Sequence, residues 1–250
     1  MNGRRDEAAK ILRELVEKNP DNFDAQNNLA AIDMQLGHYD EAEKKLQYIL
    51  SRNESLVSAR SNLAQCFFLK NDMAAAKKEA EAVLVKNNRD INSWLLMARI
   101  AIRENATESS LKNYEKVLEL SPSHIQAVTE LSRILLQKGN FDRAIQLLEE
   151  ALKKHPQHSL IMELLGSALF NRGMHDKAIE LLQSCVQIHP MNVGVYDSLM
   201  GQLYIAGRYK ESIQYFDRLK AEGLTFDSAK HRNIARIEAI QKDLQKKKKV

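Results

Sequence analysis

A glycine or an asparagine recurs every 34 residues along the chain. The recurring residues are Gly3, Gly37, Asn71, Asn105, Gly139, Gly173 and Gly207. These residue types enter the left-handed backbone region at low cost, which a helix needs where it stops and the chain turns back. A fixed period of this length is typical of an array in which one supersecondary unit is copied along the chain. The spacing therefore predicts seven copies of one helix–turn–helix unit.

Small residues keep the same register on both sides of these stops. Five residues after each stop stand Ala8, Ala42, Ala76, Ser110, Ala144, Ala178 and Ser212. Seven residues before each stop, from the second onward, stand Ala30, Ala64, Ala98, Ser132 and Gly166, and then Met200 breaks the row. Small residues at both places let two antiparallel helices approach closely. We expect them to form the contact between the two helices of each unit.

The ends of the units follow simple helix chemistry. Acidic residues stand near the start of most second helices, where we expect them to cap free N–H groups: Asp6, Asp40, Glu108, Asp142 and Asp176. Proline closes four units, at Pro20, Pro122, Pro156 and Pro190. Glu54 and Asn88 stand where two further prolines are expected, so we predict that those units are looser or bent.

The 34-residue pattern of leucine, small residue, glycine, aromatic, alanine and proline resembles the tetratricopeptide repeat. The clearest copy is Leu131, Ser132, Gly139, Phe141, Ala144 and Pro156, and the tryptophan of the pattern occurs once, as Trp94. The resemblance covers residues 3–224. It implies an all-α protein, an α-solenoid of about seven helix–turn–helix repeats that form a right-handed superhelix.

The same register predicts how the chain is organised. Residues 1–224 form the array, and the first repeat lacks its first helix. The complete repeats lie near 23–56, 57–90, 91–124, 125–158, 159–192 and 193–226. Residues 227–250 form a capping helix and a lysine-rich tail, and we expect the helix to start near residue 226 with Ile234, Ile237, Ala239 and Leu244 on one stripe.

The first repeat leaves apolar residues without their usual cover. Ile11, Leu12 and Leu15 lie on a second helix whose first helix is missing from the sequence. Natural arrays cover their ends with polar faces. One interpretation is that Met1 is a start within a longer protein; the alternative is that the lone helix is itself the cap.

Charge is concentrated at the C-terminal end. The formal net charge is +4, but residues 229–250 alone contain eight lysines or arginines against two acidic residues, so the rest of the chain is slightly acidic. Such a body offers no basic face for nucleic acid. The lysine tail is interpreted as a solvated end, with contact to acidic lipid, nucleic acid or an acidic partner as the alternative. Membrane contact is expected only through this tail. Without a signal-type segment or an apolar run of membrane-spanning length, we favour a cytoplasmic location.

Residues that could perform chemistry are few. Cys66 and Cys185 fall on packing faces, which predicts buried thiols. The histidines, His155, His158 and His189 among them, show no metal-binding spacing, and no nucleotide-binding or catalytic motif occurs. The asparagines of two glycosylation sequons, Asn53 and Asn105, fall in turns where asparagine has a structural role. We therefore predict a protein that is not an enzyme and that needs no cofactor or metal.

The resemblance implies a peptide-binding groove lined by the first helices. By register, the candidate binding residues are Asn28, Asn62, Gln65, Phe68, Leu95, Arg99, Arg103, Arg133, Leu136 and Phe170. Arginines flanked by apolar side chains suit an acidic peptide or a C-terminal carboxylate, which guanidinium groups bind in a bidentate manner. Asn28 and Asn62 are expected to form a short ladder for an extended backbone. The alternative is that all these side chains are merely solvated.

The predicted function follows from this groove. We expect a non-catalytic scaffold that binds a partner protein or peptide. Chaperone-binding members of the family use a carboxylate clamp of lysines and asparagines, and no repeat here supplies the Lys–Asn pair, so a clamp-type chaperone partner is not expected. The alternative is the repeat portion of a larger protein: a bacterial envelope or secretion component, or the interaction region of an enzyme whose catalytic domain lies outside this chain.

Overall fold

Helices are the regular secondary structure in the part of the chain that the structure describes. The computed structural model describes the backbone of residues 2–247 and the side chains of residues 7–242. Over that range fourteen helices follow one another and no strand occurs. The chain divides into two compact units, Met1–Ser121 and Pro122–Val250. We call them unit 1 and unit 2 and describe each by itself.

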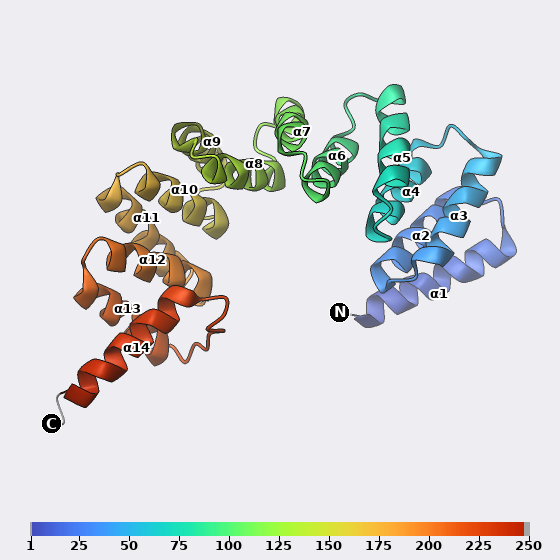
Figure 1. The fold of residues 1–250 in the computed structure, drawn as a ribbon. Coiled ribbons are helices and arrows are strands. Elements are labelled where there is room, and N and C mark those ends of the chain that lie inside the picture. Colours follow the sequence, from blue (N-terminus) through green and yellow to red (C-terminus); the bar gives the residue numbers. More distant parts are fainter. Residues whose placement is uncertain (1, 248–250) are drawn as a thin grey trace. The chain divides into compact units, whose positions relative to one another are not determined.

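Unit 1 contains one leading helix and three antiparallel helix pairs (Figure 1). Its helices are α1 (Asn2–Lys18), α2 (Phe23–Leu36), α3 (Tyr39–Arg52), α4 (Val57–Leu69), α5 (Met73–Lys86), α6 (Ile91–Arg103) and α7 (Thr107–Leu120). Each helix packs on the next one along the chain, and the first helices of consecutive pairs, α2, α4 and α6, also contact one another. Unit 1 is therefore a stack of repeats in which each pair is covered by its neighbours.

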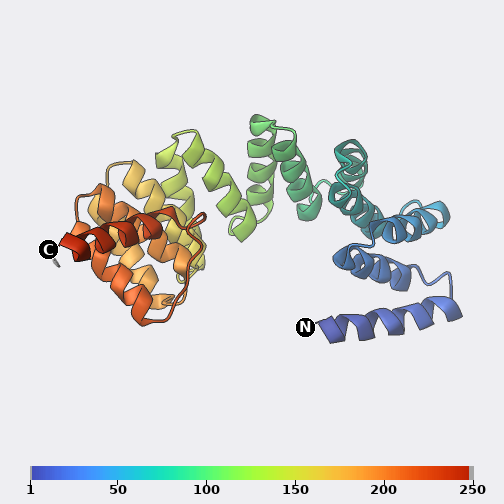
Figure 2. The same cartoon turned by 60° about the horizontal axis from the view of Figure 1, so that its bottom comes forward.

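Unit 2 contains three further pairs and a final helix. Its helices are α8 (Ile125–Gln137), α9 (Phe141–Lys154), α10 (Ser159–Asn171), α11 (His175–Ile188), α12 (Val193–Ile205), α13 (Tyr209–Ala221) and α14 (Arg232–Lys247). The last helix packs on both α12 and α13 (Figure 2). It thus covers the last helix pair of unit 2.

The predicted helix stops are confirmed at six of the seven positions. Positive φ angles occur at Gly37 (84°), Asn71 (65°), Asn105 (57°), Gly139 (73°), Gly173 (88°) and Gly207 (76°). At the first of these, the N–H of His38 donates to the carbonyl of Asp33 at 2.8 Å, which closes the end of α2. The prediction is wrong at Gly3, which lies inside α1.

The small residues lie where the helices of a pair meet, as predicted. The side chains of Ala42, Ala76, Ser110, Ala144, Ala178 and Ser212 are fully buried, and so are those of Ala30, Ala64, Ala98 and Ser132. Gly166 shows why size matters here, since a Cβ at this residue would lie 2.9 Å from Cγ of Leu182. Met200 is fully buried despite its size, and its carbonyl accepts a hydrogen bond from the Ser212 hydroxyl at 3.0 Å.

The predicted acidic residues lie at the positive ends of their helices but do not cap them. Asp40, Glu108, Asp142 and Asp176 lie inside the first turn of the second helices, and the N-cap residues of those helices make no side-chain cap bond. Among the second helices α5 is capped, by Asp72, whose side chain accepts from the N–H of Ala75. Capping side chains start most first helices, at Asn22, Asp90, His124, His158 and Asn192. The side chain of Asp6 lies outside the described residues, and α1 begins at Asn2.

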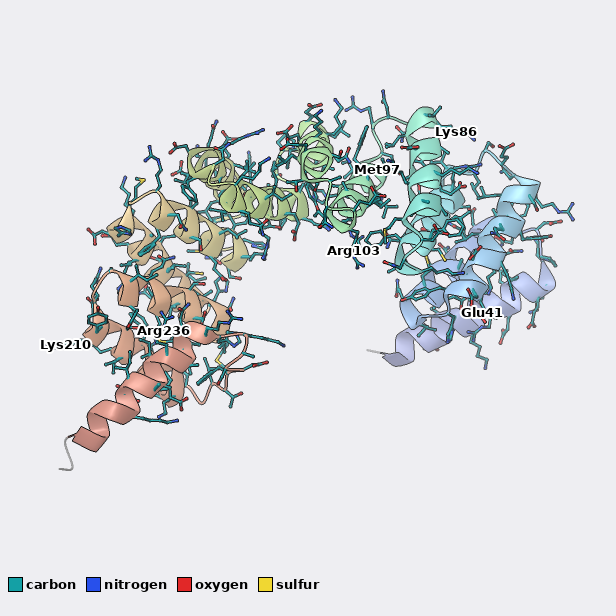
Figure 3. All side chains as sticks on the ribbon, viewed as in Figure 1. Glu41, Lys86, Met97, Arg103, Lys210 and Arg236 are labelled. Carbon is teal, nitrogen blue, oxygen red and sulfur yellow. The ribbon has the colours of Figure 1, made fainter. Side chains whose placement is uncertain are left out.

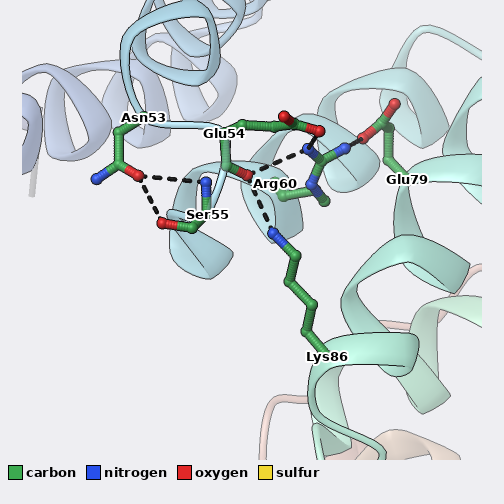
Figure 4. A network of polar contacts seen from close by, with 6 residues as sticks. All are labelled: Asn53, Glu54, Ser55, Arg60, Glu79 and Lys86. Carbon is green, nitrogen blue, oxygen red and sulfur yellow. Dashed lines mark hydrogen bonds and ion pairs between the residues drawn. The ribbon is translucent and has the colours of Figure 1, made fainter.

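Polar contacts hold the turn in which Glu54 replaces proline (Figure 4). Arg60 of α4 donates to the Glu54 carbonyl at 3.3 Å and to the carboxylate of Glu79 in α5 at 2.6 Å. Lys86 donates to the same carbonyl at 3.2 Å. The Asn53 side chain accepts from both the N–H and the hydroxyl of Ser55, so this sequon asparagine has the structural role that was predicted.

The final helix starts later than predicted. Residues near 226 are not helical, because Asp227 forms a turn in which its carbonyl accepts from the N–H of His231 at 2.8 Å. Ile234 and Ile237 are buried as expected, whereas Ala239 is exposed. Leu244 and the lysine side chains that follow lie outside the described residues. None of the described helices combines the length and the apolar character that crossing a lipid bilayer requires.

Candidate binding surface

A phenylalanine and two arginines form the centre of the candidate surface in unit 1. Phe68 lies near the end of α4, and Arg99 and Arg103 lie one turn apart on α6. The guanidinium carbons of the two arginines lie 4.3 Å and 5.5 Å from the centroid of the Phe68 ring. Stacking of this kind orients a guanidinium group while leaving N–H donors available. We call Phe68, Arg99 and Arg103 the arginine cluster.

Amides hold the two arginines in place. Arg99 donates to Oε1 of Gln65 at 3.4 Å, and Arg103 donates to Oδ1 of Asn71 at 3.4 Å. Neither arginine forms an ion pair with a carboxylate within the side chains that the structure describes. Both positive charges are therefore uncompensated locally. The structure thus brings together Gln65, Phe68, Arg99 and Arg103, four of the sequence-predicted residues.

Two asparagines of neighbouring first helices form a hydrogen bond. Asn62 of α4 donates to Oδ1 of Asn27 in α2 at 2.8 Å. Asn28 is exposed and has no part in this bond, and the ladder of Asn28 and Asn62 along a bound backbone stays a prediction. The bond joins residues that are 35 apart in the sequence. The bond between Ser198 and Glu163 at 2.9 Å has the same spacing in unit 2.

Two apolar residues of the predicted site are largely buried. Phe68 and Leu95 are only 6% and 8% exposed. Their contact with a ligand stays a prediction. The ring of Phe68 supports the two arginines that stack on it.

The remaining predicted residues lie in unit 2. Arg133 of α8 is exposed, and Leu136 of the same helix is half-buried. Phe170 of α10 is half-buried and packs edge-on against His175, with ring centroids 4.3 Å apart. Because Arg99 and Arg133 belong to different units, a channel that contains both stays a prediction.

A pocket that no sequence motif indicated lies on the other side of α6. A pocket of about 350 Å³ opens between α5, α6 and α7. Its lining is Lys77, Glu81, Met97, Ile100, Ala101, Glu104, Ala106, Ser109, Lys112 and Asn113. Figure 3 shows Met97 and Arg103 on different sides of α6, so the pocket and the arginine cluster use separate faces of that helix.

The cysteines and two of the histidines make contacts that belong to the packing of the repeats. Cys66 and Cys185 are both buried free thiols, and burial raises the pKa of each to about 11. His155 and His189 contact the carbonyls of Ser123 and Gln157, equivalent turn positions one repeat apart. No group of three or more potential metal ligands occurs within the described part of the chain.

Comparison with protein families assigns most of the chain to one kind of repeat. Two models described as tetratricopeptide repeat match residues 1–54 and 32–90. A model of the cytochrome c-type biogenesis protein H TPR domain matches residues 81–183. A model of the bacterial transcriptional activator domain matches residues 157–224. No match was found among curated protein sequences.

Solved structures of repeat proteins share the fold. The C-terminal part of a TPR repeat-containing protein from Cytophaga hutchinsonii has a TM-score of 0.70 and 14% identity, over 88% of this chain and 91% of that one. PilF of Pseudomonas aeruginosa has a TM-score of 0.65 and 17% identity, over 87% and 92%. YrrB, described as a TPR protein with an unusual peptide-binding site, has a TM-score of 0.56 and 17% identity, over 73% and 94%. Likeness at this level of identity is evidence for the fold alone.

Proposed function

Because the chain belongs to the tetratricopeptide repeat family, we propose that it is a non-catalytic scaffold that binds a carboxylate-bearing segment of a partner protein on the first helices of unit 1. The family membership and the repeat fold support a protein-interaction role in general. The choice of surface and ligand rests on the arginine cluster.

The observation that supports this surface is the pair of arginines stacked on Phe68 without a carboxylate partner. The two guanidinium groups are already oriented by the ring and the amides. The arginine side chains therefore lose little conformational entropy when a ligand carboxylate binds. The hydrogen bonds that they donate to a carboxylate are charge-assisted and therefore strong. Asn62 and Asn27 lie on the neighbouring helices and supply amide groups for the backbone of the same segment.

Selected peptides test this proposal. Peptides of about ten residues are selected against the chain by display and then synthesised, each with a partner in which every carboxylate is replaced by an amide. We expect the selected peptides to contain at least one carboxylate and the amide versions to bind at least tenfold more weakly. Arg99→Glu should weaken binding by about 2 kcal/mol or more, because the substitution replaces attraction with repulsion. Higher salt should also weaken binding, and the effect should be larger the more the arginines and the ligand carboxylate are exposed to solvent, because salt screens exposed charges most.

Lys78→Glu is the matched control, because it makes the same charge change at an exposed residue of α5. Circular dichroism establishes that both variants are folded. Equal binding by Arg99→Glu, Lys78→Glu and the unaltered chain would contradict the proposal and would move the site to another surface, such as the pocket between α5 and α7 or unit 2. Extension of the site to Arg133, Leu136 and Phe170 is tested by Arg133→Glu in the same assay.

The alternative is that the chain is the interaction portion of a larger assembly. The match of residues 81–183 to the TPR domain of cytochrome c-type biogenesis protein H favours this reading, since that model describes one domain of a larger protein. The test is co-purification from the source cells, done once with the unaltered chain and once with Arg99→Glu. Loss of the partners in the variant means that the assembly uses the arginine cluster, and their retention means that it uses another surface.

A further inference from the structure

A tyrosine of unit 2 carries an arginine in the same way as Phe68 does in unit 1. Tyr204 lies near the end of α12, four periods of 34 residues after Phe68. The guanidinium carbon of Arg236 in α14 lies 5.1 Å from the centroid of the Tyr204 ring. Arg236 lies one residue past the position that is equivalent to Arg99. The arrangement of ring and arginine in the arginine cluster therefore occurs again in unit 2.

The final helix makes this arrangement possible because it takes the place of a first helix. It packs on α12 and α13, just as α6 packs on α4 and α5. In both units the guanidinium group thus reaches the ring from the next helix of the stack. Phe170, the equivalent ring one repeat earlier, packs on His175 and has no arginine over it in the described part of the chain. The repeat alone therefore does not produce the arrangement, which needs an arginine on the following helix.

A second tyrosine extends the aromatic surface. Tyr209, at the start of α13, packs edge-on against Tyr204, with ring centroids 5.1 Å apart and ring planes at 65°. Tyr209 is 52% exposed, and Ile205, the residue after Tyr204, is 67% exposed. Arg236 is exposed as well. This surface therefore offers a ligand open apolar contact beside a guanidinium group. We call Tyr204, Tyr209 and Arg236 the tyrosine site.

The positive charge of this site has no partner among the side chains that the structure describes. Arg236 forms no ion pair there, and the hydroxyl groups of Tyr204 and Tyr209 form no hydrogen bond. The carboxylate of Asp197, which lies at the start of α14, already accepts three hydrogen bonds from the first residues of that helix. The N–H groups of the arginine and both hydroxyls are therefore available to a ligand.

We propose that the tyrosine site is a second binding site, separate from the arginine cluster, for a partner protein segment in which an acidic residue stands next to an aromatic or large apolar residue. Arg236 binds the carboxylate, since a planar guanidinium group donates two charge-assisted hydrogen bonds to it. The apolar side chain of the segment packs on Tyr209 and Ile205, which removes exposed apolar surface from water. Tyrosine and arginine are also residue types that contribute strongly to binding at protein interfaces.

A short peptide tests the proposal by NMR. The probe is an acetylated and amidated tetrapeptide of glycine, glutamate, phenylalanine and glycine, titrated into the ¹⁵N-labelled full chain. We expect saturable shifts of the amide signals at residues 204–209 and in α14. Arg236→Gln should weaken binding there at least fivefold, and a probe with glutamine in place of glutamate should bind the unaltered chain as weakly. Tyr209→Ala should also weaken binding, because the phenylalanine of the probe loses its contact.

Arg232→Gln is the matched control, because it makes the same change at an exposed residue of α14 that stacks on no described ring. It should change the affinity less than twofold, and circular dichroism checks that the variants are folded. Arg99→Gln separates the two sites, since it should remove only those shifts that lie in α4 and α6.

The proposal would be overturned by the absence of saturable shifts in unit 2, or by equal losses in Arg236→Gln and Arg232→Gln. Either result leaves the proposed function intact, because that function is tested by shifts in α4 and α6 that Arg99→Gln removes. A dimer of the chain that sedimentation detects without the peptide, and that Arg236→Gln dissociates, would overturn the proposal too, with an acidic segment of a second copy as the occupant.

Discussion

Asp197 of α12 holds the start of the final helix through Asn233. Its carboxylate accepts from the backbone N–H of Asn233 at 2.9 Å and from the side-chain amide of the same residue at 3.0 Å. A third bond comes from the N–H of Ile234 at 3.0 Å. The N-terminal N–H groups of a helix have no partner within the helix, so a carboxylate from a neighbouring helix satisfies them and meets the positive end of the dipole. Asp197 is therefore an N-cap supplied across the packing interface.

Asp197→Ala should destabilise the chain by about 1–2 kcal/mol, the usual cost of losing a helix cap. The loss should be concentrated in α14, because the three hydrogen bonds that the Asp197 carboxylate accepts all come from Asn233 and Ile234 at the start of that helix. Hydrogen exchange measures this directly, as faster exchange in residues 232–240. Lys210→Ala, at an exposed residue of α13, is the control. Unchanged exchange in α14 would contradict the role of Asp197.

Gly201 is required for the approach of the same asparagine. A Cβ at this residue would lie 2.5 Å from Nδ2 and 2.6 Å from Cγ of Asn233. Gly201→Ala should therefore displace Asn233 and destabilise the chain by about 1–3 kcal/mol, although alanine is the better helix former by about 1 kcal/mol. Gly194→Ala is a matched control, because its nearest contact is 3.3 Å. Chemical denaturation compares the two, and equal stabilities would contradict the close approach.

The fold was predictable from the sequence because each feature that the fold needs occurs several times, once in each repeat. A left-handed stop, a small residue at the helix contact and a large one beside it each recur at 34 residues, so accidental matches at one position do not matter. Two errors lie outside the regular repeat: Gly3 lies inside α1, and the delayed start of α14 depends on a turn at Asp227 that occurs once. A third lies within the repeat, because the acidic residues expected to cap the second helices lie in the first turn instead of at the N-cap.

The site was predictable only in part. Register correctly placed Gln65, Phe68, Arg99 and Arg103 near one another, because these residues lie on first helices that stack directly. It did not indicate that Asn62 bonds to Asn27, since that contact depends on the stagger between α2 and α4. It also did not indicate that Phe68 and Leu95 are largely buried, because burial depends on how far neighbouring helices approach.

The left-handed stop at Gly139 is open to a direct test. No atom lies within 4 Å of a Cβ at this residue, so any cost of substitution comes from the backbone angle of 73° alone. Gly139→Val should destabilise the chain by about 1–2 kcal/mol, because a branched residue resists the left-handed region. Gly139→Asn should cost much less, since Asn71 and Asn105 occupy the equivalent position. Thermal melting compares the two variants. Equal melting temperatures for Gly139→Val and Gly139→Asn would show that the turn does not require the left-handed conformation.

The buried thiols predict a dependence on pH. Burial raises the pKa of Cys66 and Cys185 from 9.0 to about 11. The folded state therefore keeps both thiols neutral while the unfolded state loses its protons above pH 9, so stability should fall as the pH rises from 9 to 11. Iodoacetamide at pH 8 should react slowly with the folded chain and quickly in urea. Fast labelling of the folded chain would contradict the burial of the thiols.

The ion pair between Arg60 and Glu79 should stabilise the turn that lacks proline. Both side chains are largely buried, at 15% and 14% exposure, and their charged atoms lie 2.6 Å apart. Removal of either partner leaves the other charge partly buried without compensation, so Arg60→Ala and Glu79→Ala should each cost about 2–3 kcal/mol. Arg60 also donates to the Glu54 carbonyl, which makes its loss the larger of the two. Denaturation of both single variants and of the double variant gives the coupling energy, which we expect to reach about 1–2 kcal/mol. Additive costs would mean that the two side chains do not stabilise the fold through each other and would contradict the role of the ion pair.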